Sequence, residues 1–90
     1  MDGLVLLAEF LGTLFLTLTV FASGGLWWAI GAALALVVLL IGSLSGGHVN
    51  PAISAAVYFK GGLSLQELLY YVISQVAGGV SAFYIYRVFA

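Results

Sequence analysis

The chain has 90 residues, of which 64% are apolar and 6% are charged, with a net charge of -1 and a mean hydropathy of +1.27. Because about a quarter of the residues in soluble domains are charged, this composition excludes an ordinary soluble domain. Its two basic side chains cannot form the basic surface that binds nucleic acid. Without cysteine, the chain has no disulfide, thiolate metal site or cysteine nucleophile.

Three apolar segments are long enough to cross a hydrocarbon core, which takes about 20 helical residues. They cover residues 3–21, 26–44 and 65–88. No basic residue precedes the first segment, so we interpret it as a span of the mature protein and not as a secretory signal. Ser64-Leu-Gln-Glu67 has the form of a capping box and predicts where the third helix begins. We therefore predict an all-α, multi-pass integral membrane protein with three transmembrane helices in a lipid bilayer.

Residues 45–51 interrupt this pattern, because two glycines and a proline within Ser45-Gly-Gly-His-Val-Asn-Pro51 cannot continue a helix. The apolar segment 52–60 follows and predicts a helix of about 12 to 15 Å, which is too short to cross the bilayer. It has two alternative locations. In the first, it lies at the water interface, where Asn50 is an N-cap and Pro51 is the first helical residue.

The second location is at membrane depth, where irregular backbone is tolerated only if it lines a cavity. An interfacial helix should have a charged face, yet the polar side chains between residues 52 and 59 are those of Ser54 and Tyr58. This composition favours a re-entrant half-helix.

Two ionisable residues are candidates for a functional role. Glu9 lies within the first apolar segment, where a carboxylate must face other helices and find partners, either as a structural brace or as a proton relay. His48 is either a structural histidine or a pH sensor, because its charge can change near neutrality. These two groups are too few for a metal site, and no nucleophile, base and orienting group occur at a workable spacing. We expect no metal, no cofactor and no enzymatic activity.

Three motifs resemble those of the aquaporin and aquaglyceroporin family. Residues 45–52 (S-G-G-H-V-N-P-A) resemble its first re-entrant loop, and residues 8–13 (A-E-F-L-G-T) resemble its first-span signature. Residues 75–78 (Q-V-A-G) are similar to the Q-x-x-G pattern of its third span. The resemblance implies that residues 1–90 form one half-repeat, with a re-entrant loop at 45–51 and a half-helix at 52–60. Family members usually contain two such repeats, inverted relative to each other.

The resemblance further implies a passive channel for water or small uncharged solutes such as glycerol. Asn50, Pro51 and Ala52 would form the pore motif, and the positive end of the half-helix dipole at the pore centre would disfavour cations. Glu9 and Gln75 would support the loop without binding solute. The backbone carbonyls expected to line the path belong to Gly46, Gly47, His48 and Val49.

The chain departs from the family at the pore mouth, because no arginine follows an Asn-Pro-Ala motif. The constriction candidates are all apolar, namely Ile30, Val38 and Ile53. Such a lining would pass uncharged solutes such as glycerol, or it would dewet and stay closed. The alternative interpretation is therefore a nonconducting structural or assembly membrane protein that retains the fold.

A single half-helix needs an opposing wall, so we expect a second half-channel as partner. Three spans place the chain ends on opposite faces, and Lys60 and Arg87 then fall on opposite sides, so charge hardly biases orientation. These features favour an antiparallel self-dimer. The other sources of the second half are a paralogous half that carries the arginine, or the rest of a longer channel of which this chain is a fragment. By analogy with the family, tetramer-like assembly would combine about eight chains.

Overall fold

The computed structural model describes residues 2–90, which form four α-helices and no β-strand. The helices are α1 (Gly3–Ala22), α2 (Trp27–Ser45), α3 (Pro51–Lys60) and α4 (Leu65–Phe89). By length and composition, α1, α2 and α4 can each cross a membrane, whereas α3 has only 10 residues. The predicted all-α class with three candidate spans is confirmed. The assignment of the chain to one half-repeat stays a prediction.

Local sequence accounts for most helix boundaries. Asp2 caps α1 by accepting a hydrogen bond from the backbone N–H of Leu4 at 2.9 Å. α2 and α3 end at glycines in the left-handed region, Gly46 with φ 88° and Gly61 with φ 93°, a conformation that costs glycine little. The start of α4 is a complete capping box, in which the Ser64 and Glu67 side chains each accept from the other's backbone N–H.

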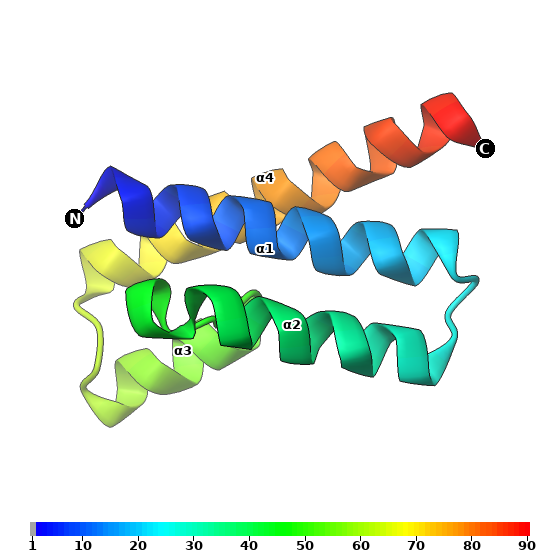
Figure 1. Ribbon diagram of the computed structural model, residues 1–90. Helices are drawn as coiled ribbons and strands as arrows, with labels where there is room; N and C mark the ends of the chain where they lie inside the picture. The colour runs from blue at the N-terminus through cyan, green and yellow to red at the C-terminus, as the bar shows by residue number, and fades with distance from the viewer. Residues whose placement is uncertain (1) are drawn as a thin grey trace.

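α1 lies at the centre of the arrangement and packs against both α2 and α4, while α3 packs against α4. Figure 1 shows that α2 runs antiparallel to α1, whereas α4 crosses α1 in the same direction. α1 and α4 approach each other closely at Gly78, where an added Cβ would collide with the carbonyl oxygen of Phe10. Small residues thus let the backbones approach, as is usual between helices in lipid.

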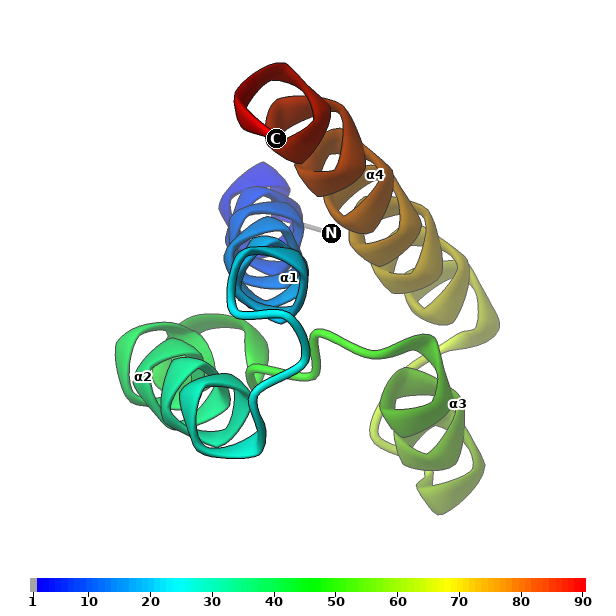
Figure 2. The ribbon, with the colours of Figure 1, turned by 90° about the vertical axis from the view of Figure 1, so that its right-hand side faces the viewer.

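The connection between α2 and α3 turns back into the molecule. In Figure 1 it runs from the end of α2 toward mid-length, and α3 returns to the end from which the connection came. Figure 2, a view along α1, shows the connection passing below α1 between α2 and α3. Gly47 lies against α2, since a Cβ there would be 3.3 Å from Cα of Val38. This path is the geometry expected of a re-entrant loop.

The surface of the molecule is largely apolar, and its interior contains a group of polar side chains. Large side chains such as Trp27 (80% exposed), Leu39 (79%) and Phe59 (84%) point outward, as suits a surface in contact with lipid. The largest fully buried side chains are instead those of Gln75, Glu9 and Ser54. The longest dimension of the molecule is 39 Å, which is enough to cross a hydrocarbon core of about 30 Å. The buried polar residues therefore mark the site of interest.

Candidate functional site

Glu9 of α1 is the centre of a buried hydrogen-bond cluster. Its side chain is fully buried and accepts four hydrogen bonds, two on each carboxylate oxygen. Oε2 accepts from the Ser45 hydroxyl at 2.6 Å and from the backbone N–H of His48 at 3.1 Å. Oε1 accepts from the backbone N–H of Val49 at 2.8 Å and from Nε2 of Gln75 at 3.0 Å. Glu9 thus joins α1 to the loop and to α4.

The loop backbone is shaped around this carboxylate. Gly46, Gly47 and Val49 all have positive φ, at 88°, 62° and 45°. Such turns direct successive N–H groups to one side, where they form a concave site for an anionic group. For a β-branched residue like Val49 this conformation is strained and needs support from its surroundings. That support comes from the bond to Glu9 and from Gly12, whose added Cβ would lie 2.9 Å from Cγ1 of Val49.

The loop carbonyls are left free by this arrangement. The N–H of Gly47 donates to the Ser45 hydroxyl at 3.2 Å, and those of His48 and Val49 donate to Glu9. By contrast, no group within residues 2–90 donates to the carbonyls of residues 46–49. These four carbonyls therefore keep their acceptor capacity within the described residues, and their role in lining a path stays a prediction.

Three polar residues for which the sequence predicted no role, Ser45, Ser54 and Tyr71, complete the cluster. The hydroxyl of Ser54 on α3 lies 2.8 Å from Nε2 of Gln75 and 2.8 Å from Nδ1 of His48. The hydroxyl of Tyr71 on α4 donates to the Ser45 carbonyl at 2.6 Å, and its ring lies 4.8 Å from that of His48. Two features of the sequence could have identified Tyr71 and Ser54. Tyr71 and Gln75 are four residues apart on one helix face, and Ser54 is a rare polar residue in an apolar half-helix.

Asn50 and Pro51 form the start of α3. Oδ1 of Asn50 accepts from the backbone N–H of Ala52 at 2.8 Å, and Pro51 occupies the first turn, where its missing N–H costs nothing. Asn50 is exposed, and its amide Nδ2 has no hydrogen-bond partner within residues 2–90. The cap therefore holds the side chain by its oxygen and leaves its donor available.

The three constriction candidates lie on two helices, Ile30 and Val38 on α2 and Ile53 on α3. Val38 lies beside Gly47 of the loop and is exposed, as is Ile53 in the first turn of α3. Ile30 is half-buried near the start of α2, and eight residues of helix place it about 12 Å along the axis from Val38. Their roles in selectivity stay predictions.

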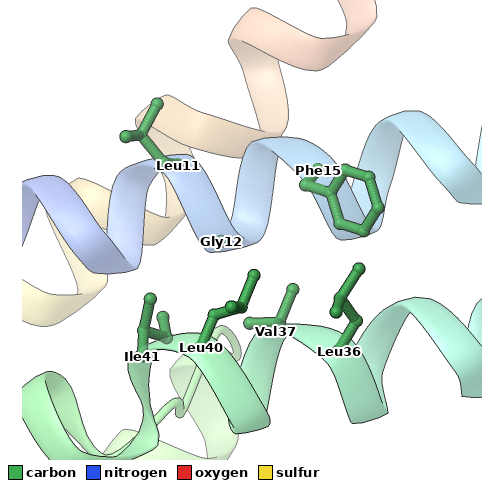
Figure 3. Close-up of a pocket in the computed structure, with 7 residues that line it drawn as sticks. All are labelled: Leu11, Gly12, Phe15, Leu36, Val37, Leu40 and Ile41. Atoms are coloured by element: carbon green, nitrogen blue, oxygen red, sulfur yellow. The ribbon is translucent and has the colours of Figure 1, made fainter.

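An apolar pocket of about 190 Å³ lies between α1 and α2 (Figure 3). Leu11, Gly12 and Phe15 of α1 and Leu36, Val37, Leu40 and Ile41 of α2 line it. None of these side chains has a group that would orient a polar solute. The pocket is thus distinct from the hydrogen-bond cluster and is a poor candidate for a permeation path.

A family model described as "Major intrinsic protein" matches residues 5–90. Aquaporin-8 from Notomys alexis is 50% identical over 50 residues, which cover 56% of this chain and 19% of that protein. The glycerol uptake facilitator protein from Pseudomonas aeruginosa is 36% identical over 91 aligned positions, covering 84% of this chain and 32% of that protein. The lens fiber major intrinsic protein from Gallus gallus is 37% identical over 87 positions, covering 84% and 33%. The chain thus spans a third or less of these relatives, and no solved structure matches it significantly.

Proposed function

Because the chain belongs to the major intrinsic protein family, we propose that it forms part of a passive channel for water or small uncharged solutes such as glycerol. It is an integral, multi-pass membrane protein. The observation that carries the proposal is the loop held by Glu9, whose N–H groups turn inward while the carbonyls of residues 46–49 stay free. A chain of free acceptors at membrane depth suits a solute that must give up its water shell.

The start of α3 supplies the donors that complement these acceptors. The N-terminus of a helix carries about half a positive charge, which disfavours cations and attracts the oxygen of water or of a hydroxyl group. The free Nδ2 of Asn50 adds a donor at the same place. Donors beside a line of acceptors favour the passage of neutral solutes in single file.

The apolar constriction candidates Ile30, Val38 and Ile53 favour glycerol-like solutes over a path restricted to water. An apolar ring tolerates the carbon backbone of a polyol, and it lacks the charged donor expected of a water-selective mouth. The same property can dewet a narrow pore and close it. A nonconducting structural or assembly protein is therefore the alternative that a permeability measurement must test.

We place the second half of the channel in a second copy of this chain, inserted upside down. Asn50, Pro51, Ala52 and Ile53 are all exposed at the start of α3, where a permeation path needs an opposing wall. The last turns of α3 and α4 carry Lys60 and Arg87 and lie at opposite ends of the molecule (Figure 1). Such a balanced charge distribution permits both orientations. By family analogy, several such pairs would assemble into a tetramer of channels.

Osmotic swelling of vesicles that contain the full chain tests the proposal. We expect the vesicles to respond faster than protein-free vesicles in water or glycerol gradients. Asn50→Leu removes both cap and donor, whereas Asn50→Asp keeps a capping oxygen and replaces the amide donor with a charged carboxylate oxygen. Both should reduce permeability about two- to tenfold, because one neutral hydrogen bond contributes about 0.5–1.5 kcal/mol.

The outcomes separate the two interpretations. Unchanged swelling in both variants would remove Asn50 from the mechanism. Wild-type vesicles that swell no faster than empty ones would favour the nonconducting alternative. Circular dichroism of each variant shows whether a loss of permeability reflects a loss of helical structure.

A further inference from the structure

The donor and the acceptor of each hydrogen bond in the cluster can be assigned, starting from Glu9. All four of its partners are donors, and two of these are backbone N–H groups that cannot reverse their role. Gln75 must therefore turn its amide nitrogen toward Glu9, because its oxygen would be repelled there. The structure has this orientation even though Oε1 of Gln75 is then buried without a partner among residues 2–90. The cluster thus requires that the amide N–H groups of Gln75 face Glu9.

The same assignment of donors and acceptors extends to Ser54 and His48. Nε2 of Gln75 also donates to the Ser54 hydroxyl oxygen, at 2.8 Å. Within residues 2–90, the other side-chain partner of this hydroxyl is Nδ1 of His48, also at 2.8 Å. The hydroxyl hydrogen of Ser54 must then point to Nδ1, which accepts it. A neutral imidazole that accepts at Nδ1 carries its hydrogen on Nε2.

Ser54 therefore holds His48 by one defined ring nitrogen. The fully buried hydroxyl fixes one edge of the imidazole, and the Tyr71 ring lies 4.8 Å away, centre to centre. The backbone N–H of His48 is held separately by Glu9. These contacts, which come from α3, α4 and α1, hold the residue immediately before the strained Val49.

We propose that Ser54 is a positioning residue, which acts through Nδ1 of His48 to keep the loop carbonyls facing the permeation path. The inference deepens the proposed function, since it concerns the same loop. It also makes a separate claim about hydrogen position that is independent of conduction. Loss of the hydroxyl would leave Nδ1 without its donor and release the side chain that precedes Val49.

The test uses nitrogen NMR of the full chain with labelled histidine, reconstituted in lipid bilayers at mildly alkaline pH. The chain has one histidine, so the ring signals belong to His48 alone. We expect the wild type to carry its hydrogen on Nε2, with Nδ1 shifted as a hydrogen-bond acceptor. In Ser54→Ala, Nδ1 should move toward the position of a free ring nitrogen and a second tautomer should appear. Ser54→Thr, which keeps the hydroxyl, should restore the wild-type signals.

Permeability is measured on the same samples. Ser54→Ala should lower it at least about twofold, the effect of losing one hydrogen bond, and Ser54→Thr should recover it. Ser81→Ala on α4 is the matched control, because Ser81 takes part in none of these bonds and should change neither measurement.

A hydrogen on Nδ1 in the wild type, or an unchanged Nδ1 signal in Ser54→Ala, overturns the inference. The wild-type spectrum tests the tautomer even if the alanine variant fails to fold. Altered signals with wild-type permeability would overturn the positioning role. If no variant conducts and neither does the wild type, the channel proposal fails while the tautomer assignment stands on its spectrum.

Discussion

Glu9 illustrates how a charged residue is accommodated inside a membrane-spanning helix. An isolated carboxylate in an apolar medium is very costly, and it persists only when several donors replace water. Here four donors do so, two from the loop backbone and two from the side chains of Ser45 and Gln75. In return, the carboxylate organises a loop whose left-handed residues would not hold this shape alone. We therefore propose that the residue is a structural brace for the loop, since its geometry gives no support to a proton relay open to solvent.

Replacing Glu9 with Gln should destabilise the protein, because the new amide must turn its own donors toward two of the existing donors. We expect a loss of about 2–5 kcal/mol in the free energy of unfolding, the range for a disrupted buried network with a charged member. A detergent-denaturant titration followed by circular dichroism measures it. Glu67→Gln is the matched control, since Gln also serves in a capping box on the exposed start of α4. Equal midpoints for the two variants would contradict this account of Glu9.

Among the helices, the packing of α1 against α4 sets the position of the cluster. Glu9 and Gln75 meet because the two helices cross at the next turn, where Gly78 packs on the backbone of Phe10. The Phe21 and Tyr86 rings, 5.6 Å apart, form a second contact toward the other end. A change in helix separation at Gly78 would therefore act on the polar cluster as well as on packing.

Gly78→Ala should force the two helices apart and weaken the bond between Glu9 and Gln75. We expect a loss of about 1–3 kcal/mol of stability, as for other overpacked sites, together with lower permeability. Gly79→Ala is an adjacent control of the same chemistry, because its added Cβ would meet only Oγ1 of Thr17 at an ordinary 3.6 Å. Unfolding midpoints and vesicle swelling report both effects. The interpretation would be wrong if both glycine variants behaved alike.

At the scale of the whole molecule, the exposed surface next to the loop is the start of α3. The start of α3 is exposed, and α3 packs on α4. A permeation path formed by this surface needs a second wall, and an inverted copy would place its own loop and half-helix there. The proposed pairing thus rests on the same groups that carry the channel proposal.

Antiparallel pairing predicts that the chain inserts in both orientations. Since the chain has no cysteine, single cysteines can be introduced at Phe59 in α3 and at Ala22 in α1, near opposite ends and both exposed. A membrane-impermeant thiol reagent added outside sealed vesicles should label about half of each variant, because the charge bias is weak. Detergent should make the labelling complete. Full labelling of one variant and none of the other would exclude the inverted pair and assign the second half to another chain or segment.

The sequence by itself determined the all-α class, the three candidate spans and the break between the second and third of them. These features depend on the length of apolar segments and on local residues such as Pro51 and the Ser64 cap, so neighbours along the chain are sufficient to predict them. The motifs also identified Glu9, Asn50 and Gln75 as residues of interest.

Only the tertiary structure decided which donors meet Glu9 and which group donates in each further hydrogen bond of the cluster. The partners of Glu9 lie 36 to 66 residues away along the chain, and they meet only because α1 crosses α4 and the loop folds back beneath α1. No local pattern predicts the positive φ of Val49 or the bonds of Ser54 and Tyr71. Hydrogen bonds depend on distance and direction in space, whereas apolar length and capping are properties of contiguous residues.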